Sequence, residues 1–293
     1  MAAEIKNALS GTLVADAASL GLHWLYDQKQ IAAIEDTGSV LFRQPDANAF
    51  AGRKGYFAQG GRHAGQLSHY GESARLMVEA CAGGRYDSEV HRQAFFDTFG
   101  PCGSFCGYAD RPTKALIARM IIEGDDLQDP SGMDDDQNPG LCPVAGVFAH
   151  GLSRDDTVRA VSVISTHDDV LDSADLLHQC LEHISGGMTL KEALKQTAHS
   201  GSSPIQQLMQ EALAMDSYQP LKAALHFGMP CHVPQGMPLV WHILSHVDSF
   251  ESAVRDNILC GGDSCGRAMS LGALAGLAFG IPANMLKALQ IGV

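Results

Sequence analysis

Residues 260–286 read CGGDSCGRAMSLGALAGLAFGIPANML, and this stretch decides which class of fold the sequence favours. From Ala268 to Leu286 no charged residue occurs over 19 positions. Gly272, Gly276 and Pro282 interrupt the run, and the neighbouring sequence offers neither flanking anchors nor a second span. We therefore expect a helix buried in the core of the protein and no contact with a membrane.

A helical repeat is also present near the start of the chain. Apolar residues recur every three or four positions, at Ala8, Leu9, Leu13, Ala17 and Leu20. This spacing places them on one face of a helix that packs against the core.

Three signals mark the starts of further helices. Pro112 stands where a first helical turn tolerates proline, and Thr189 with Glu192 fits a capping box. Ser249 is typical of a residue that opens a helix, and an apolar stripe from Pro238 to His246 predicts a helix before it.

Strand patterns are missing from the sequence. No alternating run of Val, Ile or Thr is bounded by turn residues, as a sheet would require. Breaks fall at Gly60–Gly61, Asp125–Pro139, Gly186–Gly187 and Gly261–Gly262, and none is a linker long enough to separate domains. We predict an all-α fold, a single compact helical bundle over residues 1–293.

Charge and cysteine usage exclude several classes of protein. The chain has 33 acidic against 20 basic residues, a formal net charge of −13, which argues against nucleic acid as a partner. Eight cysteines at irregular spacing in a long chain favour reduced thiols over a disulfide framework. With no secretory leader pattern at the start, these features predict a cytoplasmic protein.

The most distinctive local motif lies where the apolar helix begins. Gly262 lets the backbone turn, and Asp263 and Ser264 then fall at a helix start, where free N–H groups favour anions. Cys265 lies in the same turn, a position that lowers the pKa of a thiol. The alternative is a structural N-cap with a buried cysteine.

Two further polar runs precede predicted helices. Thr166–Asp169 sets His167 beside two carboxylates, where it would bind a ligand or simply begin a helix. Ser68–Ser73 carries polar groups suited to facing a cleft. The other histidines are scattered, and we expect them to be surface groups or satisfied core groups.

The chain resembles the ADP-ribosylglycohydrolase family, in the branch that contains jellyfish J-type crystallins and selenoprotein J. Residues 8–22 are similar to its opening helix, with Asp16 at the conserved aspartate, and residues 138–144 resemble its second motif. Ser165–His167 resembles the segment with the family histidine. Residues 249–282 follow its C-terminal motif, with the two glycines and Asp263 in register.

This resemblance implies an all-α bundle with a cleft for ADP-ribose and two Mg²⁺ ions held by carboxylate and hydroxyl ligands. The matching positions here are Glu72, Ser73 and Asp263 as metal ligands. Cys265 replaces an aspartate and Gly266 a threonine, and a soft sulfur is a poor ligand for hard Mg²⁺. The resemblance therefore implies a degenerate dinuclear magnesium site, with Mg²⁺ as a possible cofactor.

The first functional hypothesis is a hydrolase that cleaves an N- or O-glycosidic bond of a ribosyl group, with ADP-ribose or an ADP-ribosylated molecule as its partner. Glu72 and Asp263 would orient water or a residual metal ion. Substrate contacts would come from the following residues: Asp16, Asn138, His167, Gly262 and Ser264.

Two other hypotheses stay open. The position of Cys265 resembles the one at which selenoprotein J has selenocysteine. The first alternative that this resemblance implies is a protein whose nucleophilic or redox chemistry depends on Cys265. The second is a non-enzymatic, crystallin-like protein.

Overall fold

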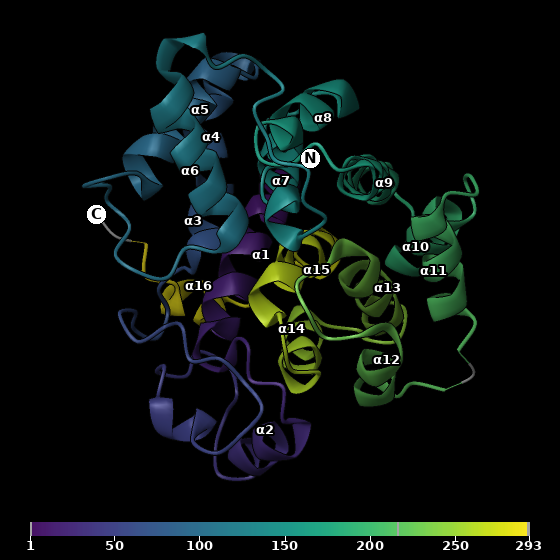
Figure 1. The fold of residues 1–293 in the computed structure, drawn as a ribbon. Helices are drawn as coiled ribbons and strands as arrows, with labels where there is room; N and C mark the ends of the chain where they lie inside the picture. The colour runs from purple at the N-terminus through teal and green to yellow at the C-terminus, as the bar shows by residue number, and fades with distance from the viewer. Residues whose placement is uncertain (1, 216, 292–293) are drawn as a thin grey trace.

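The computed structural model describes residues 2–215 and 217–291. Two long helices, α1 (Ala2–Ser19) and α15 (Ser264–Phe279), lie side by side at the centre, and the other helices surround them (Figure 1). The all-α prediction is confirmed, since the described residues form helices joined by loops and only isolated β-bridges.

The surrounding helices follow one another along the chain. They are α2 (Gln28–Glu35), α3 (His69–Arg75), α4 (Met77–Ala80), α5 (Ser88–Phe99), α6 (Arg111–Glu123), α7 (Val144–Ala149), α8 (Arg154–Ser162), α9 (Asp168–Ser185), α10 (Leu190–Ala198), α11 (Pro204–Leu213), α12 (Pro220–Phe227), α13 (Val233–Leu244), α14 (Phe250–Leu259) and α16 (Ala283–Ala288). Short 3₁₀ turns lie at Leu20–Leu22, Ala47–Phe50, Ala82–Gly84, Gly124–Asp126 and Asn138–Leu141.

Small residues let α1 and α15 approach with their backbones in contact. A Cβ atom on Gly272 would lie 2.5 Å from the carbonyl oxygen of Gly11, and one on Gly276 would lie 2.5 Å from that of Asn7. The Thr12 hydroxyl donates to the carbonyl oxygen of Met269 at 3.2 Å. The glycines within the predicted core helix therefore serve close packing and do not break the helix.

Most predicted helix starts are confirmed. Thr189 and Glu192 form the capping box of α10, and Ser249 caps α14. Pro112 lies in the first turn of α6. The helix predicted from the stripe Pro238–His246 is present as α13, which begins earlier, at Val233, and contains this proline in its interior.

The uncharged stretch Ala268–Leu286 is continuously buried only in its first half, up to Gly276, and Phe279 and Leu286 are exposed. Residues 264–276 of α15 are buried throughout, and α15 ends at Gly280, whose φ is +72°. Within the described ranges, no helix is both long and apolar enough to cross a membrane.

Apolar side chains gather in two clusters. The larger one surrounds α1 and α15, with Val14, Trp241 and Leu271 fully buried in it. The smaller one lies among α4 to α8 and includes Phe95 and Leu116. The polar site described below lies where the start of α15 meets the loops after α1.

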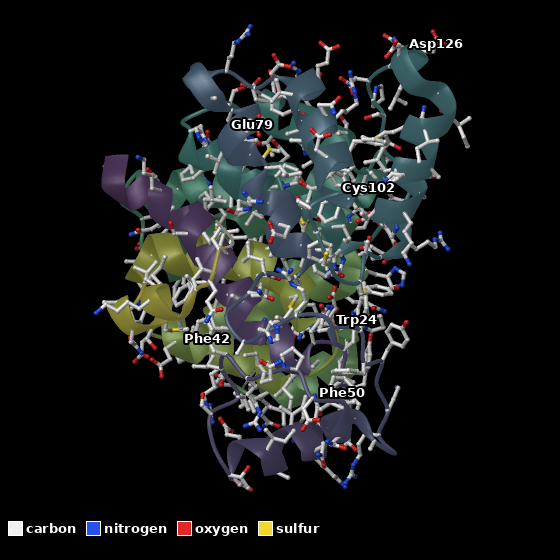
Figure 2. The ribbon with its side chains drawn as sticks, turned by 90° about the vertical axis from the view of Figure 1, so that its left-hand side faces the viewer. Trp24, Phe42, Phe50, Glu79, Cys102 and Asp126 are labelled. Atoms are coloured by element: carbon white, nitrogen blue, oxygen red, sulfur yellow. The ribbon has the colours of Figure 1, made fainter. Side chains whose placement is uncertain are left out.

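Irregular segments bring aromatic side chains to this site. Trp24 follows the first 3₁₀ turn with φ of +65°, and Leu25 pairs with Gly55 in an isolated bridge. The loop between α5 and α6 carries Cys102 and Tyr108 (Figure 2 labels Trp24 and Cys102). The rings of Trp24 and Tyr108 bring these loops together, with 5.1 Å between their centroids.

Candidate functional site

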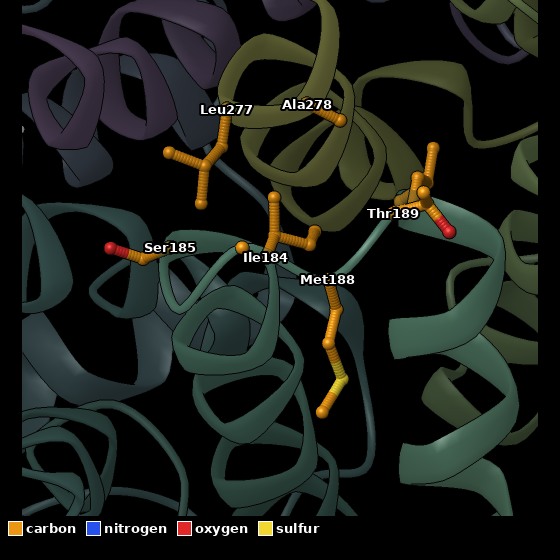
Figure 3. Close-up of a pocket in the computed structure, with 8 residues that line it drawn as sticks. Ile184, Ser185, Met188, Thr189, Leu277 and Ala278 are labelled. Atoms are coloured by element: carbon orange, nitrogen blue, oxygen red, sulfur yellow. The ribbon is translucent and has the colours of Figure 1, made fainter.

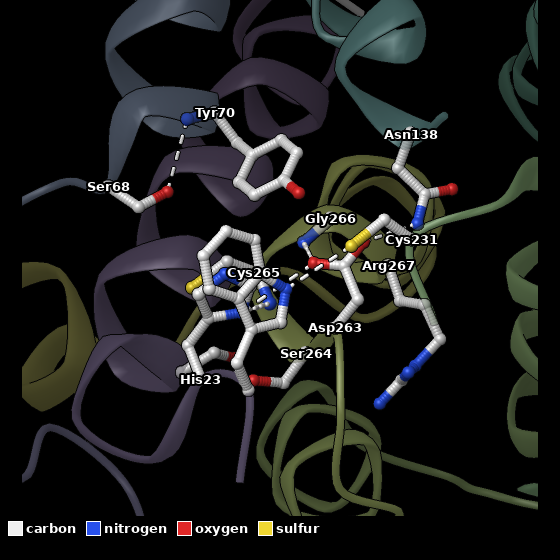
Figure 4. A network of polar contacts seen from close by, with 12 residues as sticks. His23, Ser68, Tyr70, Asn138, Cys231, Asp263, Ser264, Cys265, Gly266 and Arg267 are labelled. Carbon is white, nitrogen blue, oxygen red and sulfur yellow. Dashed lines mark hydrogen bonds and ion pairs between the residues drawn. The ribbon is translucent and has the colours of Figure 1, made fainter. Parts of the chain in front are cut away.

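Asp263 stands at the start of α15, and its carboxylate is fully buried. Gly261 and Gly262, with φ of +77° and +69°, turn the chain before it. The carboxylate accepts hydrogen bonds from the amide of Asn138 at 2.7 Å and from the backbone N–H of Gly266 at 3.1 Å (Figure 4). Burial raises the pKa of Asp263, although these hydrogen bonds and Arg267 oppose the shift.

His23 joins the end of the first helical segment to this carboxylate. Its Nδ1 lies 3.6 Å from Oδ1 of Asp263 and accepts the backbone N–H of Cys265 at 3.3 Å. Burial lowers the pKa of His23, so the imidazole is neutral and Nδ1 is free to accept this hydrogen bond. The backbone is tied here as well, since the N–H of Trp24 donates to the carbonyl oxygen of Gly262 at 2.8 Å.

A second buried carboxyl, Asp16, comes from α1. It accepts the backbone N–H of Ser68 at 2.7 Å and the Ser68 hydroxyl at 2.5 Å. Burial raises the pKa of Asp16 to about 6 against the opposing effect of these hydrogen bonds. A side chain on Gly71 would overlap this carboxyl, so glycine is required at that position in α3.

Arg267 places a positive charge beside Asp263 in the buried region. Its Nη2 donates to the carbonyl oxygen of Gly261 at 2.7 Å, and its Nε donates to the side-chain oxygen of Asn257 at 2.8 Å. Arg267 is 1% exposed, and its Nη1 has no hydrogen-bond partner among the described residues. A buried guanidinium with a free donor is suited to binding an oxygen-rich group.

Three aromatic side chains, Trp24, Tyr56 and Tyr108, separate these polar groups from solvent, and we call them the aromatic cover. The Trp24 ring lies 4.4 Å from that of His23, and its indole N–H donates to the sulfur of Cys231 at 3.3 Å. The centroid of the Trp24 ring also lies 5.1 Å from that of Tyr108 and 5.9 Å from that of Tyr56. The exposed fraction of the residue rises from 7% at Trp24 to 56% at Tyr56, so Tyr56 lies nearer the surface.

Cys265 differs from the reactive thiol that its place in the helix suggested. Its side chain is fully buried, and its sulfur lies 3.6 Å from the backbone oxygen of Asp16. Burial, together with the carboxyls of Asp16 and Asp263, raises the pKa of Cys265 well above its ordinary value. The predicted lowering is wrong because desolvation and two nearby acids outweigh the helix start.

Glu72 and Ser73, the other proposed metal ligands, have different surroundings from Asp263. The carboxylate of Glu72 lies between two guanidinium groups, 3.4 Å from Nη2 of Arg62 and 2.9 Å from Nε of Arg75. Ser73 is buried, and its hydroxyl lacks a partner in the described part of the chain. No group of three or more His, Cys, Asp or Glu side chains in the described ranges is arranged to hold a metal ion.

His167 lies at the start of α9, where it acts as the N-cap. Its Nδ1 accepts the backbone N–H of Asp169 at 3.2 Å, and a third of its side chain is exposed. None of its hydrogen bonds or ion pairs joins it to Asp263 or Asp16.

Most residues that the sequence singled out are brought together at the start of α15. Asn138 and Gly262 contact Asp263 or its neighbours, and Ser264 is buried beside them with an unpartnered hydroxyl. Sequence reasoning missed His23 and Arg267. His23 was expected to be a surface or satisfied core histidine, which is wrong because its Nε2 is buried without a partner among the described residues. Only the arrangement of the helices reveals these two.

A surface pocket lies elsewhere, between the turn after α9 and the end of α15 (Figure 3). Ile184, Met188 and Leu277 line it, and none of its lining residues is charged. It therefore offers none of the acid–base groups found near Asp263.

Comparisons with known proteins agree over almost the whole chain. A family model described as ADP-ribosylglycohydrolase matches residues 2–292. Crystallin J1A of Tripedalia cystophora is 23% identical over 301 residues, which cover 96% of this chain and 90% of that protein. Crystallin J1B of the same animal is 22% identical over 302 residues with the same coverage.

One solved structure has the same fold. It is described as an ADP-ribosylglycohydrolase-related protein complex, and it superposes with a TM-score of 0.63 at 15% sequence identity. The match covers 98% of this chain and 92% of that one.

Proposed function

The chain belongs to the ADP-ribosylglycohydrolase family, and from this membership we propose that it hydrolyses a ribosyl glycosidic bond with Asp16 and Asp263. The family supports a glycohydrolase-like activity in general. The finer proposal concerns ADP-ribose or an ADP-ribosylated molecule as the ligand, and buried carboxyls in place of a pair of metal ions.

Unmet hydrogen-bonding capacity beneath the aromatic cover is the observation that carries this proposal. Buried polar atoms nearly always have partners in folded proteins, so several orphaned atoms in one place call for a polar ligand or water. The atoms without partners among the described residues are His23 Nε2, Tyr70 Oη, Ser264 Oγ and Arg267 Nη1. A ribosyl group carries hydroxyls that match these donors and acceptors.

Two carboxyls in buried surroundings suit glycoside hydrolysis. Such enzymes pair an acid that protonates the leaving group with a carboxylate that stabilises positive charge at the anomeric carbon. Asp16, whose pKa burial raises to about 6, is suited to supply the proton near neutral pH. Asp263, in its carboxylate form, would face the developing positive charge.

The reaction balances as a hydrolysis. The bond between the anomeric carbon and the leaving group breaks, and the leaving group takes the proton of Asp16. The oxygen of water forms the new bond to the anomeric carbon, and the proton that water releases finally restores Asp16.

The residues present do not fit a dinuclear magnesium site, although the family is generally metal-dependent. Mg²⁺ prefers several oxygen ligands in octahedral geometry. Both oxygens of Asp263 are engaged, one by Asn138 and one by Gly266, and Glu72 is neutralised by two arginines. Cys265 offers sulfur, so no step of this proposal passes through a metal ion.

Binding is tested by thermal unfolding with ADP-ribose, in EDTA and in Mg²⁺. A ligand that binds only the folded state raises the midpoint. We expect a rise of equal size in both conditions. A rise that needs Mg²⁺ would contradict the metal-free proposal.

Hydrolysis is tested with an N-linked and an O-linked ADP-ribosyl substrate. Asp16→Asn and Asp263→Asn should each lower kcat by about 100-fold or more, as loss of an acid–base group does. Asp175→Asn, which removes a carboxylate paired with Arg154 between α8 and α9, is the matched control and should keep full activity. Full activity in both site variants would contradict the assignment of Asp16 and Asp263 to the hydrolysis.

A second candidate function is supported by the enclosure of the site and by the names of the relatives. The curated relatives are called crystallins, and the polar groups near Asp263 lie beneath the aromatic cover. A protein retained for bulk or stability would show neither a thermal shift with ADP-ribose nor hydrolysis. Chemistry at Cys265 is the least supported alternative, because its thiol is buried and held protonated.

A further inference from the structure

A buried histidine–aspartate pair lies beside the proposed site and has no part in the function so far. His69 is the first residue of α3 and is 1% exposed, and Asp110 precedes α6 and is 3% exposed. Nε2 of His69 lies 3.2 Å from Oδ2 of Asp110. Burial of two ionisable groups together is costly unless each compensates the other.

The ring of His69 lies among the residues of the site. It is 4.0 Å from the ring of Tyr70, 6.4 Å from that of Trp24 and 6.2 Å from that of Tyr108. It is therefore beneath the aromatic cover, on the same side as His23, whose ring is 5.7 Å from that of Tyr70.

Both ring nitrogens of His69 and Oδ2 of Asp110 are buried without a hydrogen-bond partner among the described residues. Nε2 and Oδ2 therefore lie at ion-pair distance without forming a hydrogen bond. A histidine that only filled space would gain nothing from two buried ring nitrogens that lack hydrogen-bond partners beside a carboxylate. A carboxylate close to one nitrogen of an imidazole stabilises the imidazolium, and the other nitrogen can accept a proton.

Asp110 is itself held in place. Its Oδ1 accepts the backbone N–H of Thr113 at 2.9 Å as the N-cap of α6, and Oδ2 remains for His69. Its pKa is lowered: burial alone would raise it, but His69 and Thr113 outweigh that effect, so Asp110 is a carboxylate.

We propose that His69 is the general base of the hydrolysis, and that Asp110 is the positioning residue that orients it. This inference rests on the proposed function and completes it. As the water oxygen bonds to the anomeric carbon, Nδ1 of His69 takes a proton from that water. The leaving group takes the proton of Asp16, and His69 afterwards passes its proton to Asp16 through solvent.

The test measures kcat, its pH profile and the thermal shift with ADP-ribose in His69→Gln and Asp110→Asn. We expect His69→Gln to lower kcat by about 100-fold or more while the thermal shift is kept. Asparagine preserves the helix cap at position 110. Asp110→Asn should lower kcat by about tenfold or more and move the acid limb of the profile to lower pH, because the imidazolium loses its countercharge.

The pH profile of Asp110→Asn can be assigned to one group, because the charged and titratable groups that face His69 are known. They are Asp110, Tyr108, Tyr70, Asp16 and His23. Of these, only Asp110 is changed in the variant, so a shift of the acid limb reports on its charge. A purely structural loss would lower kcat without moving the limb.

His91→Gln is the matched control. His91 is also a fully buried histidine, hydrogen-bonded to the Tyr86 hydroxyl at 2.9 Å in the smaller cluster, and its replacement should leave kcat within about twofold of wild type.

The outcomes separate the two claims. Full kcat in His69→Gln overturns this inference while the proposed function stands, and no hydrolysis by the wild type overturns both. If His69→Gln fails to fold, the pH profile of kcat in Asp110→Asn tests the inference instead. An acid limb at the same pH as in the wild type then overturns the inference.

Discussion

Asp16 links the stability of the fold to pH. Burial raises its pKa from 3.8 to about 6, so between these values the native state holds a proton that the unfolded state has released. Stability therefore falls as pH rises through this window. The shift of roughly two units corresponds to a contribution of about 3 kcal/mol that is lost by pH 7.

Denaturant unfolding at pH 4 and pH 7 measures this effect. Asp16→Asn should reduce the loss of unfolding free energy between these two pH values, because an amide does not titrate. The difference between wild type and variant cancels groups that titrate in both, such as His23, whose pKa shifts in the opposite direction. If the unfolding free energy of wild type and variant fell equally between pH 4 and pH 7, Asp16 would not be the cause of the fall.

Single residues of the site were only partly predictable from sequence. Asp16, Asn138 and Asp263 were found because motifs mark them, and the structure places all three in buried polar contacts at the centre. The proposed catalytic roles of these residues stay predictions. The sequence did not pair His69 with Asp110, because one begins α3 and the other precedes α6. Only tertiary packing brings Nε2 of His69 within 3.2 Å of Oδ2 of Asp110.

At the scale of elements, the contact between α1 and α15 leaves the least room for larger side chains. Gly272→Ala adds a methyl group 2.5 Å from a backbone oxygen of α1, which cannot move without displacing the helix. The gain in helix propensity, about 1 kcal/mol, is smaller than the cost of overpacking, about 1–3 kcal/mol. We expect a net loss of stability in urea unfolding.

Gly186→Ala is the control for this change. Gly186 follows α9 with φ of −75°, which alanine adopts readily. The stability of Gly186→Ala should stay near that of the wild type. An equal loss of stability in Gly186→Ala and Gly272→Ala would contradict the explanation by close packing of α1 and α15.

Element boundaries followed from sequence where caps are local. The capping box of α10 involves groups three residues apart, so the sequence alone contains it. The start of α13 was missed because a proline usually ends a helix, whereas Pro238 is held inside a buried one. The loops around Trp24 and Tyr108 had no local signal, since contacts between distant segments fix them.

At the scale of the whole molecule, we propose that residues 1–293 form one domain organised around α1 and α15. Hydrogen exchange in the native state measures this, because the last amides to open are those of the most buried unit. The amides of α1 and α15 should exchange most slowly, and those of α2, where only Ile31 is buried, much faster. Exchange of α1 at the rate of α2 would contradict a core built on the central pair.

The central pair also has a consequence for biosynthesis. The hydrogen bond from Thr12 to Met269 joins residues 257 positions apart. A ribosome makes α1 before α15, so the apolar face of α1 lacks its partner while the residues between the two helices are synthesised. Exposed apolar surface in unfinished chains invites aggregation. We therefore expect shortened chains that lack α15 to be substrates for chaperones and proteases.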